Sequence, residues 1–474
     1  MATVSNVPGV YVEDVSTPVL VTQVATAIPV FIGYTETHYS PLEPFRITSL
    51  KEYEQRFGGP FVESFVANFN ADGVFDSLEI QNPSGFKTYY SVRHYFANGG
   101  GPCYVLSVAS YSSAANVEDT LAQAIEKLQY LDEATIVLIP DAMKIDTAEN
   151  AALFYKDVLA EVADLGDKFL LIDLHSDELG DPIADFKDSI GTENLKYAAA
   201  YFPFLNSAYS FVQGNTKIKI TIDGISYTSG KQPSIQDWLN RAIGVVSGDP
   251  DIEESLDQFP SFLVPNSTRL SSLTEAINSK VLVVPPSGAI AGIYAKTDDE
   301  RGVWKAPANV VIKDVTGPTY RMNEIENGDL NVDPSTGKSI NAIKFFPGKG
   351  TMVWGARTLD GNSNEWRYVP VRRLFNTIEE SIKKSIDYAV FETNDANTWQ
   401  RLKATIENYF ISLFRQGAFA GNSNEEAFFV NIGLNSSMTS QDVLEGRLII
   451  HVGIAAVRPA EFITMRFTHQ LQTS

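Results

Sequence analysis

Cysteine is almost absent from this sequence. Cys103 is the only cysteine in 474 residues, so no disulfide can form within the chain and no thiolate cluster can bind a metal. Histidine is also scarce, and its five positions lack the short, regular spacing of a metal site. They are His38, His94, His175, His451 and His469. We therefore predict neither a metal centre nor a bound cofactor, and we expect the fold to depend on buried apolar surface and on partners.

Long apolar runs are absent too. No stretch approaches the roughly 18 to 20 consecutive apolar residues of a membrane-spanning helix. Residues 1–10 contain neither the basic start nor the apolar core of a secretory leader. We expect assembly in the cytoplasm of the producing cell, without insertion into a membrane. The protein would leave that cell only by lysis or as part of a particle.

Positive charge is in deficit. The chain has 37 Lys and Arg against 58 Asp and Glu, a net charge of −21, which argues against nucleic acid as a partner because phosphate binding needs an excess of cations. Residues 344–474 carry 14 Lys and Arg against 13 Asp and Glu, so the whole acidic excess lies in residues 1–343. In a polymer this would put acid on outward domains and leave the assembling part near neutral. A generic acidic surface explains the count equally well.

Residues 27–297 have the pattern of a parallel sheet with helices on both faces. The length and the 44% hydrophobic content allow two or three domains. Apolar runs alternate with helical patterns in this part of the chain, as βαβ units require. The predicted strands are residues 28–34, 104–109, 135–139, 169–174, 197–204 and 281–284, and the predicted helices are 117–131, 147–165 and 183–190. Insertions at about 39–96 and 206–270 interrupt the pattern, and connecting loops follow at 298–343.

Residues 344–460 predict a second, α+β domain. Apolar residues recur at i, i+4 spacing from Leu374 to Ile386 and again along residues 398–413, which predicts two amphipathic helices. Several cations lie off these apolar stripes. They are Arg372, Arg373, Lys383 and Lys384 near the first helix, and Arg401 and Lys403 on the second. A solvated helix face explains them as well as a binding surface does.

Both ends of the chain have the pattern of free strands. Residues 7–15 and 461–471 alternate in the period of two that a strand requires. The apolar or aromatic positions are Val10, Tyr11 and Val12 at the amino end and Ile463, Met465 and Phe467 at the carboxyl end. An uncovered strand edge can template another chain. From these residues alone, a strand paired within its own domain is the simpler interpretation.

Three short motifs suggest chemistry, but none has the context that its chemistry needs. The sequence TGKS at residues 336–339 ends like a phosphate-binding loop, yet Val332 stands where that loop has its first glycine. The glycines 99–101 precede a predicted strand, whereas a dinucleotide fingerprint follows one. Asp173 and His175 lie at a strand end, but no Gly-x-Ser-x-Gly elbow accompanies them and a solvated pair is simpler. We predict no catalytic residue.

Longer strings carry a more specific signal than these motifs. They are PGVYVED (8–14), SGAIAGIYAKTDDERGVWKAPAN (287–309), VWGARTL (353–359), VRRLFNTIEESI (371–382), FRQGAF (414–419), EEAFFV (425–430) and GRLIIHVGIAAVRPAEF (446–462). They closely resemble contractile tail sheath proteins, which are the sheath subunits of contractile-tailed phages, R-type tailocins and extracellular contractile injection systems. The resemblance is continuous in the last third of the chain and covers the middle only in outline.

The resemblance implies an α/β plus α+β fold with exchanged ends. Residues 27–297 would form a subtilisin-like α/β domain with inserted decorations, and residues 344–460 an α+β domain. Strands from neighbouring subunits would complete that second domain. Residues 1–26 and 461–474 would be the exchanged arms, pairing through the six apolar or aromatic positions named above. A helix of the second domain would contact an inner tube through the six cations.

The resemblance also implies partners and an activity. Copies of this chain would form hexameric rings stacked helically around an inner tube protein, with baseplate and tail terminator proteins at the ends. The sheath would contract, without nucleotide hydrolysis, to drive the tube through a target envelope. A single chain that carries both arms and the α/β domain is more similar to phage, tailocin or extracellular injection sheaths than to the two-chain sheath of type VI secretion.

Two other functions stay open at this point. An α/β hydrolase would use Asp173 or His175, so either substitution by Ala would abolish its activity. A binding module on a particle surface would recognise a receptor through residues 39–96 or 206–270. Neither alternative would form tubes.

Overall fold

The chain divides into two compact units. The computed structural model describes residues 20–39, 42–70, 74–81, 83–113, 116–176, 179–210, 217–222, 225–226, 237, 251, 272–273, 275–277 and 279–462. The α/β unit comprises Ala25–Asn376 and Arg458–Ser474, and the terminal unit comprises Met1–Val24 and Thr377–Val457. One helix, α11 (Val369–Ile386), begins in the α/β unit and ends in the terminal unit.

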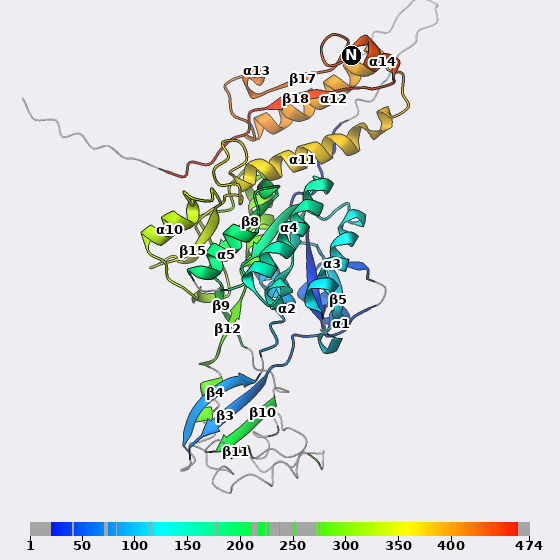
Figure 1. Cartoon of the computed structure of the whole chain (residues 1–474). Coiled ribbons are helices and arrows are strands. Elements are labelled where there is room, and N and C mark those ends of the chain that lie inside the picture. The colour runs from blue at the N-terminus through cyan, green and yellow to red at the C-terminus, as the bar shows by residue number, and fades with distance from the viewer. Residues whose placement is uncertain are drawn as a thin grey trace, which may run out of the picture. The chain divides into compact units, whose positions relative to one another are not determined.

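A nine-stranded sheet forms the centre of the α/β unit (Figure 1). Its order is β13-β16-β15-β8-β7-β6-β1-β5-β2. The strands are β13 (Val310–Val311), β16 (Gly350–Val353), β15 (Ile340–Phe346), β8 (Ala198–Phe202), β7 (Phe169–Asp173), β6 (Ile136–Leu138), β1 (Pro29–Thr35), β5 (Cys103–Ser110) and β2 (Pro44–Ile47). The six strands from β15 to β5 are parallel, which confirms the predicted α/β sheet.

Helices cover both faces of this sheet, so its central strands are apolar on both sides. Along β1, Phe31 packs into one core cluster, whereas Val30 and Ile32 pack into the other. The helices α2 (Thr88–Ala97) and α9 (Ser287–Arg301) belong to the first cluster, and α3 (Val117–Ile125), α4 (Ala148–Leu165) and α5 (Asp181–Ser189) belong to the second. A further helix, α1 (Leu50–Phe57), adds Tyr53 and Phe57 to the first cluster.

The helices α2 and α9 lie unusually close together because α9 has glycine where they meet. A Cβ atom added at Gly288 would lie 2.2 Å from the carbonyl oxygen of Ser91, and one at Gly292 would lie 2.5 Å from that of Tyr95. Interiors are packed too densely for backbone and side chain to share such a space. The two glycines therefore set the distance between the helices.

Two smaller sheets complete the α/β unit. One has the order β11-β10-β3-β4 and the other β12-β9-β14. Their strands are β3 (Ser64–Phe69), β4 (Phe75–Gln81), β10 (Lys217–Ile222) and β11 (Ile225–Ser226), then β9 (Leu205–Ser210), β12 (Val281–Val284) and β14 (Val315–Pro318). The strand predicted at 281–284 is thus present, but it pairs antiparallel with β9 outside the main sheet. Its burial alternates, as expected where only one face is covered.

The structure divides the chain differently from the sequence pattern. The predicted insertion at 39–96 contains β2 of the main sheet and most of the core helix α2. Only β3 and β4 of this segment belong to a separate sheet, which they share with β10 and β11. The predicted loops at 298–343 include the helix α10 (Glu324–Asn331). The second unit begins at Thr377 and not at Lys344, because β15 and β16 extend the main sheet beyond residue 344.

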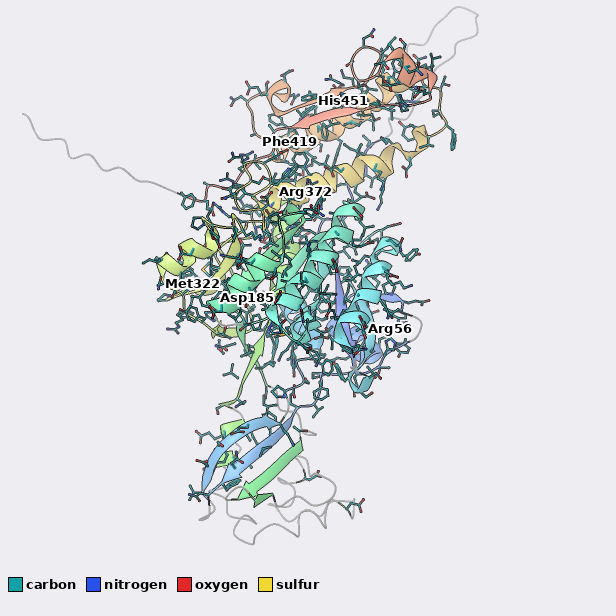
Figure 2. All side chains as sticks on the ribbon, viewed as in Figure 1. Arg56, Asp185, Met322, Arg372, Phe419 and His451 are labelled. Atoms are coloured by element: carbon teal, nitrogen blue, oxygen red, sulfur yellow. The ribbon has the colours of Figure 1, made fainter. Side chains whose placement is uncertain are left out.

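The terminal unit packs helices against a ribbon of two strands. Its elements after α11 are α12 (Ala396–Arg415), α13 (Asn424–Ala427), β17 (Phe428–Asn431), α14 (Ser440–Leu444) and β18 (His451–Ile454). The Asp395 side chain caps α12 by accepting a hydrogen bond from the amide of Thr398 at 3.0 Å. Phe410 from α12 packs its ring against those of Phe419 and Phe428, with centroids 5.7 and 5.3 Å away. Figure 2 labels Phe419 and His451 in this unit.

Candidate assembly interface

Asp141 follows β6 at the carboxyl edge of the parallel sheet, where α/β enzymes place their active sites. Its buried carboxylate accepts hydrogen bonds from the amides of Tyr34 at 2.8 Å, Lys87 at 2.6 Å and Thr88 at 3.1 Å, and from Thr88 Oγ1 at 2.8 Å. Burial raises the pKa of the Asp141 carboxyl, although these donors oppose the rise. Because the donors belong largely to the first turn of α2, Asp141 acts as a helix cap.

Asp173, the last residue of β7, caps a second core helix. Its Oδ1 accepts from the amide of Ser287 at 2.9 Å and its Oδ2 from the Ser287 hydroxyl at 2.5 Å, at the first residue of α9. Burial raises the pKa of Asp173 to about 7 despite these bonds. His175 points elsewhere, since its Nε2 donates to the carbonyl of Ile145 at 2.6 Å. The predicted solvated pair is therefore wrong, because Asp173 is buried.

A serine and a histidine also meet at this edge, but not as nucleophile and base. His38 Nδ1 lies 3.1 Å from Ser107 Oγ, which lies 2.6 Å from Thr35 Oγ1. Thr35 donates its one hydroxyl proton to the carbonyl of Thr37 at 2.8 Å, so Ser107 must donate its own proton to Thr35. His38 is then the donor to Ser107. An activated serine needs the opposite arrangement.

The TGKS segment is a turn, as its failed motif predicts. Lys338 is 4% exposed, and its ammonium group donates to the carbonyl of Lys187. Burial lowers the pKa of Lys338. The Ser339 hydroxyl donates to the carbonyl of Asn331 at 2.5 Å. The groups that would bind phosphate thus hold the loop against its own chain.

The ribbon of β17 and β18 has open edges. The two strands pair antiparallel from Phe428 with Ile454 to Asn431 with His451. Within the described residues no third strand joins this ribbon, although residues 418–420 pair with 455–457, which continue the chain past the carboxyl end of β18. Two strands alone are marginally stable. Their unpaired edges can accept further strands.

The solvent side of the ribbon carries an aromatic ring. Phe429 stands directly opposite Gly453, and a Cβ atom added at Gly453 would lie 2.1 Å from Phe429 Cε1. The ring therefore covers the glycine, an arrangement that stabilises paired strands. Phe429 remains 53% exposed. The ribbon offers an apolar face as well as open edges.

Residues 20–24 are the described root of the predicted N-terminal arm, and they follow α11. The amides of Thr22 and Val24 donate to Ser385 Oγ at 3.1 Å and to Ser381 Oγ at 3.0 Å. Four residues of helix rise about 6 Å and two residues of extended chain span about 6.6 Å, so the two spacings match. The six predicted arm positions lie outside the described residues; they are Val10, Tyr11, Val12, Ile463, Met465 and Phe467.

The described root of the C-terminal arm is held by Glu461 within the α/β unit. Arg357 donates from Nε to Oε1 at 2.9 Å and from Nη2 to Oε2 at 2.5 Å. Asn331 Nδ2 adds a bond at 3.1 Å and the Tyr368 hydroxyl one at 3.2 Å. Burial would raise the pKa of Glu461, but the bonds from Arg357 and the other donors lower it below its usual value. The carboxylate is therefore ionised at neutral pH.

Two of the six cations that were predicted to contact an inner tube are buried. Arg372 is 2% and Arg373 3% exposed. Arg373 forms a bidentate ion pair with the buried Asp298, at 3.1 and 2.5 Å, and Arg372 stacks on the ring of Trp366 at 4.4 Å. Figure 2 labels Arg372 where α11 begins. Both arginines hold the start of this helix within the α/β unit, and their burial contradicts the prediction that they contact an inner tube.

The other four cations are on the surface. The side chain of Lys383 is 73% exposed, and those of Lys384, Arg401 and Lys403 are between 40% and 49% exposed. Each lies near a glutamate, with Lys384 3.2 Å and Lys383 3.5 Å from Glu380. Exposed pairs of this kind contribute little to stability. These side chains can be reached by a partner.

The sequence pattern did not single out the turn between α11 and α12. Phe391 is fully exposed there and has a φ of +71°, which is rare for an aromatic residue. Val390 beside it is 62% exposed. The signal was available, since Tyr388 to Phe391 form an apolar run in a connection that should be polar. This turn is a second apolar surface of the terminal unit.

The part of the chain that the structure describes contains neither a candidate membrane span nor a candidate metal-binding cluster. No described helix combines the length and the apolar character needed to cross a bilayer. Nor do three His, Cys, Asp or Glu side chains gather, within the same ranges, as a metal ion requires. The surfaces that stand out are those of the terminal unit and the roots of the two arms.

Comparison with known proteins relates this chain to tail sheath proteins. Residues 362–470 match the family model described as phage tail sheath C-terminal domain. A putative prophage major tail sheath protein of Pseudomonas aeruginosa is 29% identical over 181 residues, which are 37% of this chain and 44% of that protein. A tail sheath protein of Vibrio phage KVP40 is 28% identical over 130 residues, which are 27% of this chain and 19% of that protein. The chain thus spans less than half the length of these relatives.

Solved structures are similar over almost the whole chain. The anti-feeding prophage helical sheath in its contracted state is 30% identical, with a TM-score of 0.64, and the match covers 98% of this chain and 100% of that one. The sheath complex of the extracellular contractile injection system PVC, also contracted, is 29% identical with a TM-score of 0.63 and covers 99% of both chains. The similarity therefore extends well beyond the segment that the family model matches.

Proposed function

This chain belongs to the contractile tail sheath family, and we propose that it is a structural subunit of a contractile sheath. Copies polymerise as helically stacked rings around a rigid inner tube, and the sheath shortens to drive the tube through a target envelope. The observation that carries the proposal is the 30% identity to a helical sheath along 98% of this chain. The α/β unit would be the subtilisin-like domain of such a sheath.

The chain ends are exchanged between subunits in this proposal. The edges of the β17–β18 ribbon support it, because no strand among the described residues pairs with them and an extended arm from a neighbour can add to an edge of this kind. Each backbone hydrogen bond contributes only about 0.5 to 1.5 kcal/mol net. Several bonds per arm, repeated in every subunit, would nevertheless keep the polymer connected while the compact units rotate as rigid bodies.

Contraction draws its energy from the repacking of subunits and not from catalysis. The engagement of Lys338, Asp141 and Asp173 in bonds to their own chain supports this view, since these are the groups that a phosphate site or an α/β active site would require. We propose no catalytic residue, and nothing in the geometry of the described residues favours the hydrolase alternative.

Contact with the inner tube is assigned to the exposed cations Lys383, Lys384, Arg401 and Lys403. Their exposure supports the assignment, because a partner can pair with them at little cost in dehydration. Baseplate and tail terminator proteins would meet the ends of the sheath. The subunit would be assembled in the producing cell and then carried on a phage tail or a related extracellular particle.

Electron microscopy of the purified protein in negative stain tests the proposal. We expect tubes or rings with helical order, either spontaneously or on addition of the inner tube protein. A chain that stays monomeric under both conditions would contradict the proposal. Hydrolysis of a model ester, lost on the Asp173→Ala substitution, would favour the enzyme instead.

A further inference from the structure

The predicted C-terminal arm follows a segment of the chain that passes from one compact unit to the other. The strand β18 and the paired residues up to Val457 belong to the terminal unit, whereas the chain from Arg458 onward belongs to the α/β unit. The N-terminal arm has its root in the terminal unit, on Ser381 and Ser385. The two arms are therefore rooted on different compact units of the same subunit.

Apolar burial contributes little to the attachment of the C-terminal root. Arg458 and Ala460 are exposed and Phe462 is 77% exposed. Phe462 lines a cavity of about 410 Å³ together with Trp354 and Tyr368, and it does not fill it. Glu461 is the residue of this segment whose side chain is fixed by several bonds.

The partner of Glu461 is itself tied to the main sheet. The side chain of Arg357 is 3% exposed, and its Nη1 donates to the carbonyl of Gly361. Its backbone is held by Asn341 of β15, which accepts from the Arg357 amide at 2.7 Å and donates to the Arg357 carbonyl at 2.7 Å. A force on Glu461 is thus transmitted through two side chains to a central strand.

We propose that Arg357 and Glu461 form an ionic anchor that fixes the root of the C-terminal arm to the main sheet. The proposal rests on the proposed function, since the arm bears a load only within a sheath. A pull exerted by a neighbouring subunit on this arm reaches the α/β unit through the anchor. Without it, the same pull reaches residues 451–457 and strips them from the two-stranded ribbon, which is marginally stable.

The central test replaces the charge and keeps the shape. Glu461→Gln keeps the shape and one acceptor oxygen, which can serve Asn331 or Tyr368 but not both. It leaves the buried guanidinium of Arg357 without a counter-ion, which is strongly unfavourable. A double variant, Arg357→Met with Glu461→Met, removes the ion pair without leaving a buried charge unpaired. It is therefore expected to fold even if Glu461→Gln does not. The matched control is Glu133→Gln, because Glu133 also pairs with an arginine and a tyrosine but is 59% exposed.

The first measurement uses the soluble subunit. Spin labels at Ile325→Cys and Phe462→Cys report the distance between α10 and the root, and the buried Cys103 does not react. We expect a narrow distance distribution in the parent chain and in the control. Glu461→Gln should broaden it, with the released population rising about a hundredfold. The double variant should broaden it less, because no charge is left unpaired. An unchanged distribution in both anchor variants would overturn the anchor.

The second measurement is sheath formation with the same variants. We expect both anchor variants to form at least about tenfold fewer sheaths than the parent, and the control to match the parent. Normal sheaths from variants whose root is released would overturn the role in assembly. If the parent chain itself forms no sheath, the proposed function fails, and the spin-label distances still decide whether the anchor exists.

Discussion

Asp141 and Asp173 show why a carboxylate at the edge of a parallel sheet need not belong to an active site. The helices α2 and α9 begin in the protein interior, where their first amides have no water to bind. Each receives a buried aspartate from the end of a neighbouring strand. A dehydrated carboxylate would otherwise be costly, and the helix amides supply the compensating bonds. Asp141 and Asp173 lie where an α/β enzyme would have its active site, but their role is structural.

The raised pKa of Asp173 predicts a dependence of stability on pH. Its pKa is about 7 in the folded chain against an ordinary value of 3.8. Between these values the unfolded chain has lost a proton that the folded chain keeps, so the free energy of unfolding falls as pH rises from about 4 to about 7 and is level above that. At about 1.4 kcal/mol per pH unit, the window costs roughly 3 to 4 kcal/mol.

Asp173→Asn should remove that dependence. The amide oxygen still accepts from Ser287, and the group no longer titrates. Urea unfolding from pH 4 to pH 8 measures the difference in unfolding free energy between parent and variant. We expect the free energy of unfolding of the parent to fall relative to that of the variant as pH rises from 4 to 7. A difference that stays constant across this range would show that Asp173 is ionised throughout.

At the scale of elements, the close contact of α2 and α9 sets how these two helices pack on one face of the main sheet. Gly288 and Gly292 of α9 approach the backbone of α2 directly, and buried aromatic rings complete the layer. One such contact joins the hydroxyls of Tyr201 and Tyr294 at 2.7 Å. The helix that carries both glycines also receives the Asp173 cap, so its position and its start are fixed by different residues.

Gly288→Ala should therefore destabilise the α/β unit. The added methyl group would lie 2.2 Å from the carbonyl oxygen of Ser91, a backbone atom that cannot rotate away. Separating two packed helices costs about 2 kcal/mol or more. Gly328→Ala is the matched control, because Gly328 also lies in a helix but has open space around it. The control should be neutral or gain up to about 1 kcal/mol. Equal unfolding midpoints for both variants would disprove the steric argument.

The surface cations of α11 and α12 give a second prediction at this scale. Charge reversal at Lys383 and Lys384, or at Arg401 and Lys403, should change the stability of the subunit by only about 1 to 2 kcal/mol. Sheath formation around the inner tube should nevertheless fall about tenfold or more, because like charges would then face each other. Electron microscopy with added tube protein gives the count.

A matched control for this prediction lies in the other unit. Arg46→Glu reverses a cation of similar exposure, 47%, on β2. It should leave sheath formation unchanged. If reversal at both helix pairs also leaves assembly unchanged, the tube contact is not on these helices.

At the scale of the whole molecule, the sequence predicted the elements better than their partners. Strands buried on both faces have continuous apolar runs, so β1, β5, β6, β7 and β8 were identifiable. The sheet to which β12 belongs was not identifiable, because an apolar run of four residues does not reveal which strands it pairs with. Nor could spacing show that Arg373 is buried, since its partner Asp298 is 75 residues away. Pairing over such distances is decided by tertiary packing.

The proposed exchange of arms would distinguish a connected polymer from a stack of separate subunits. Deletion of residues 2–15 removes the predicted strand around Tyr11 but leaves the described root, in which Thr22 and Val24 bind α11. The subunit should stay soluble and unfold like the parent, yet form no ordered sheath. Deletion of residues 2–6 alone is the control, because it spares the strand predicted at 7–15, and it should keep sheaths. Long, ordered sheaths from the larger deletion would show that neighbouring subunits are joined without this arm, and the exchange of strands would then have to be abandoned for the amino end.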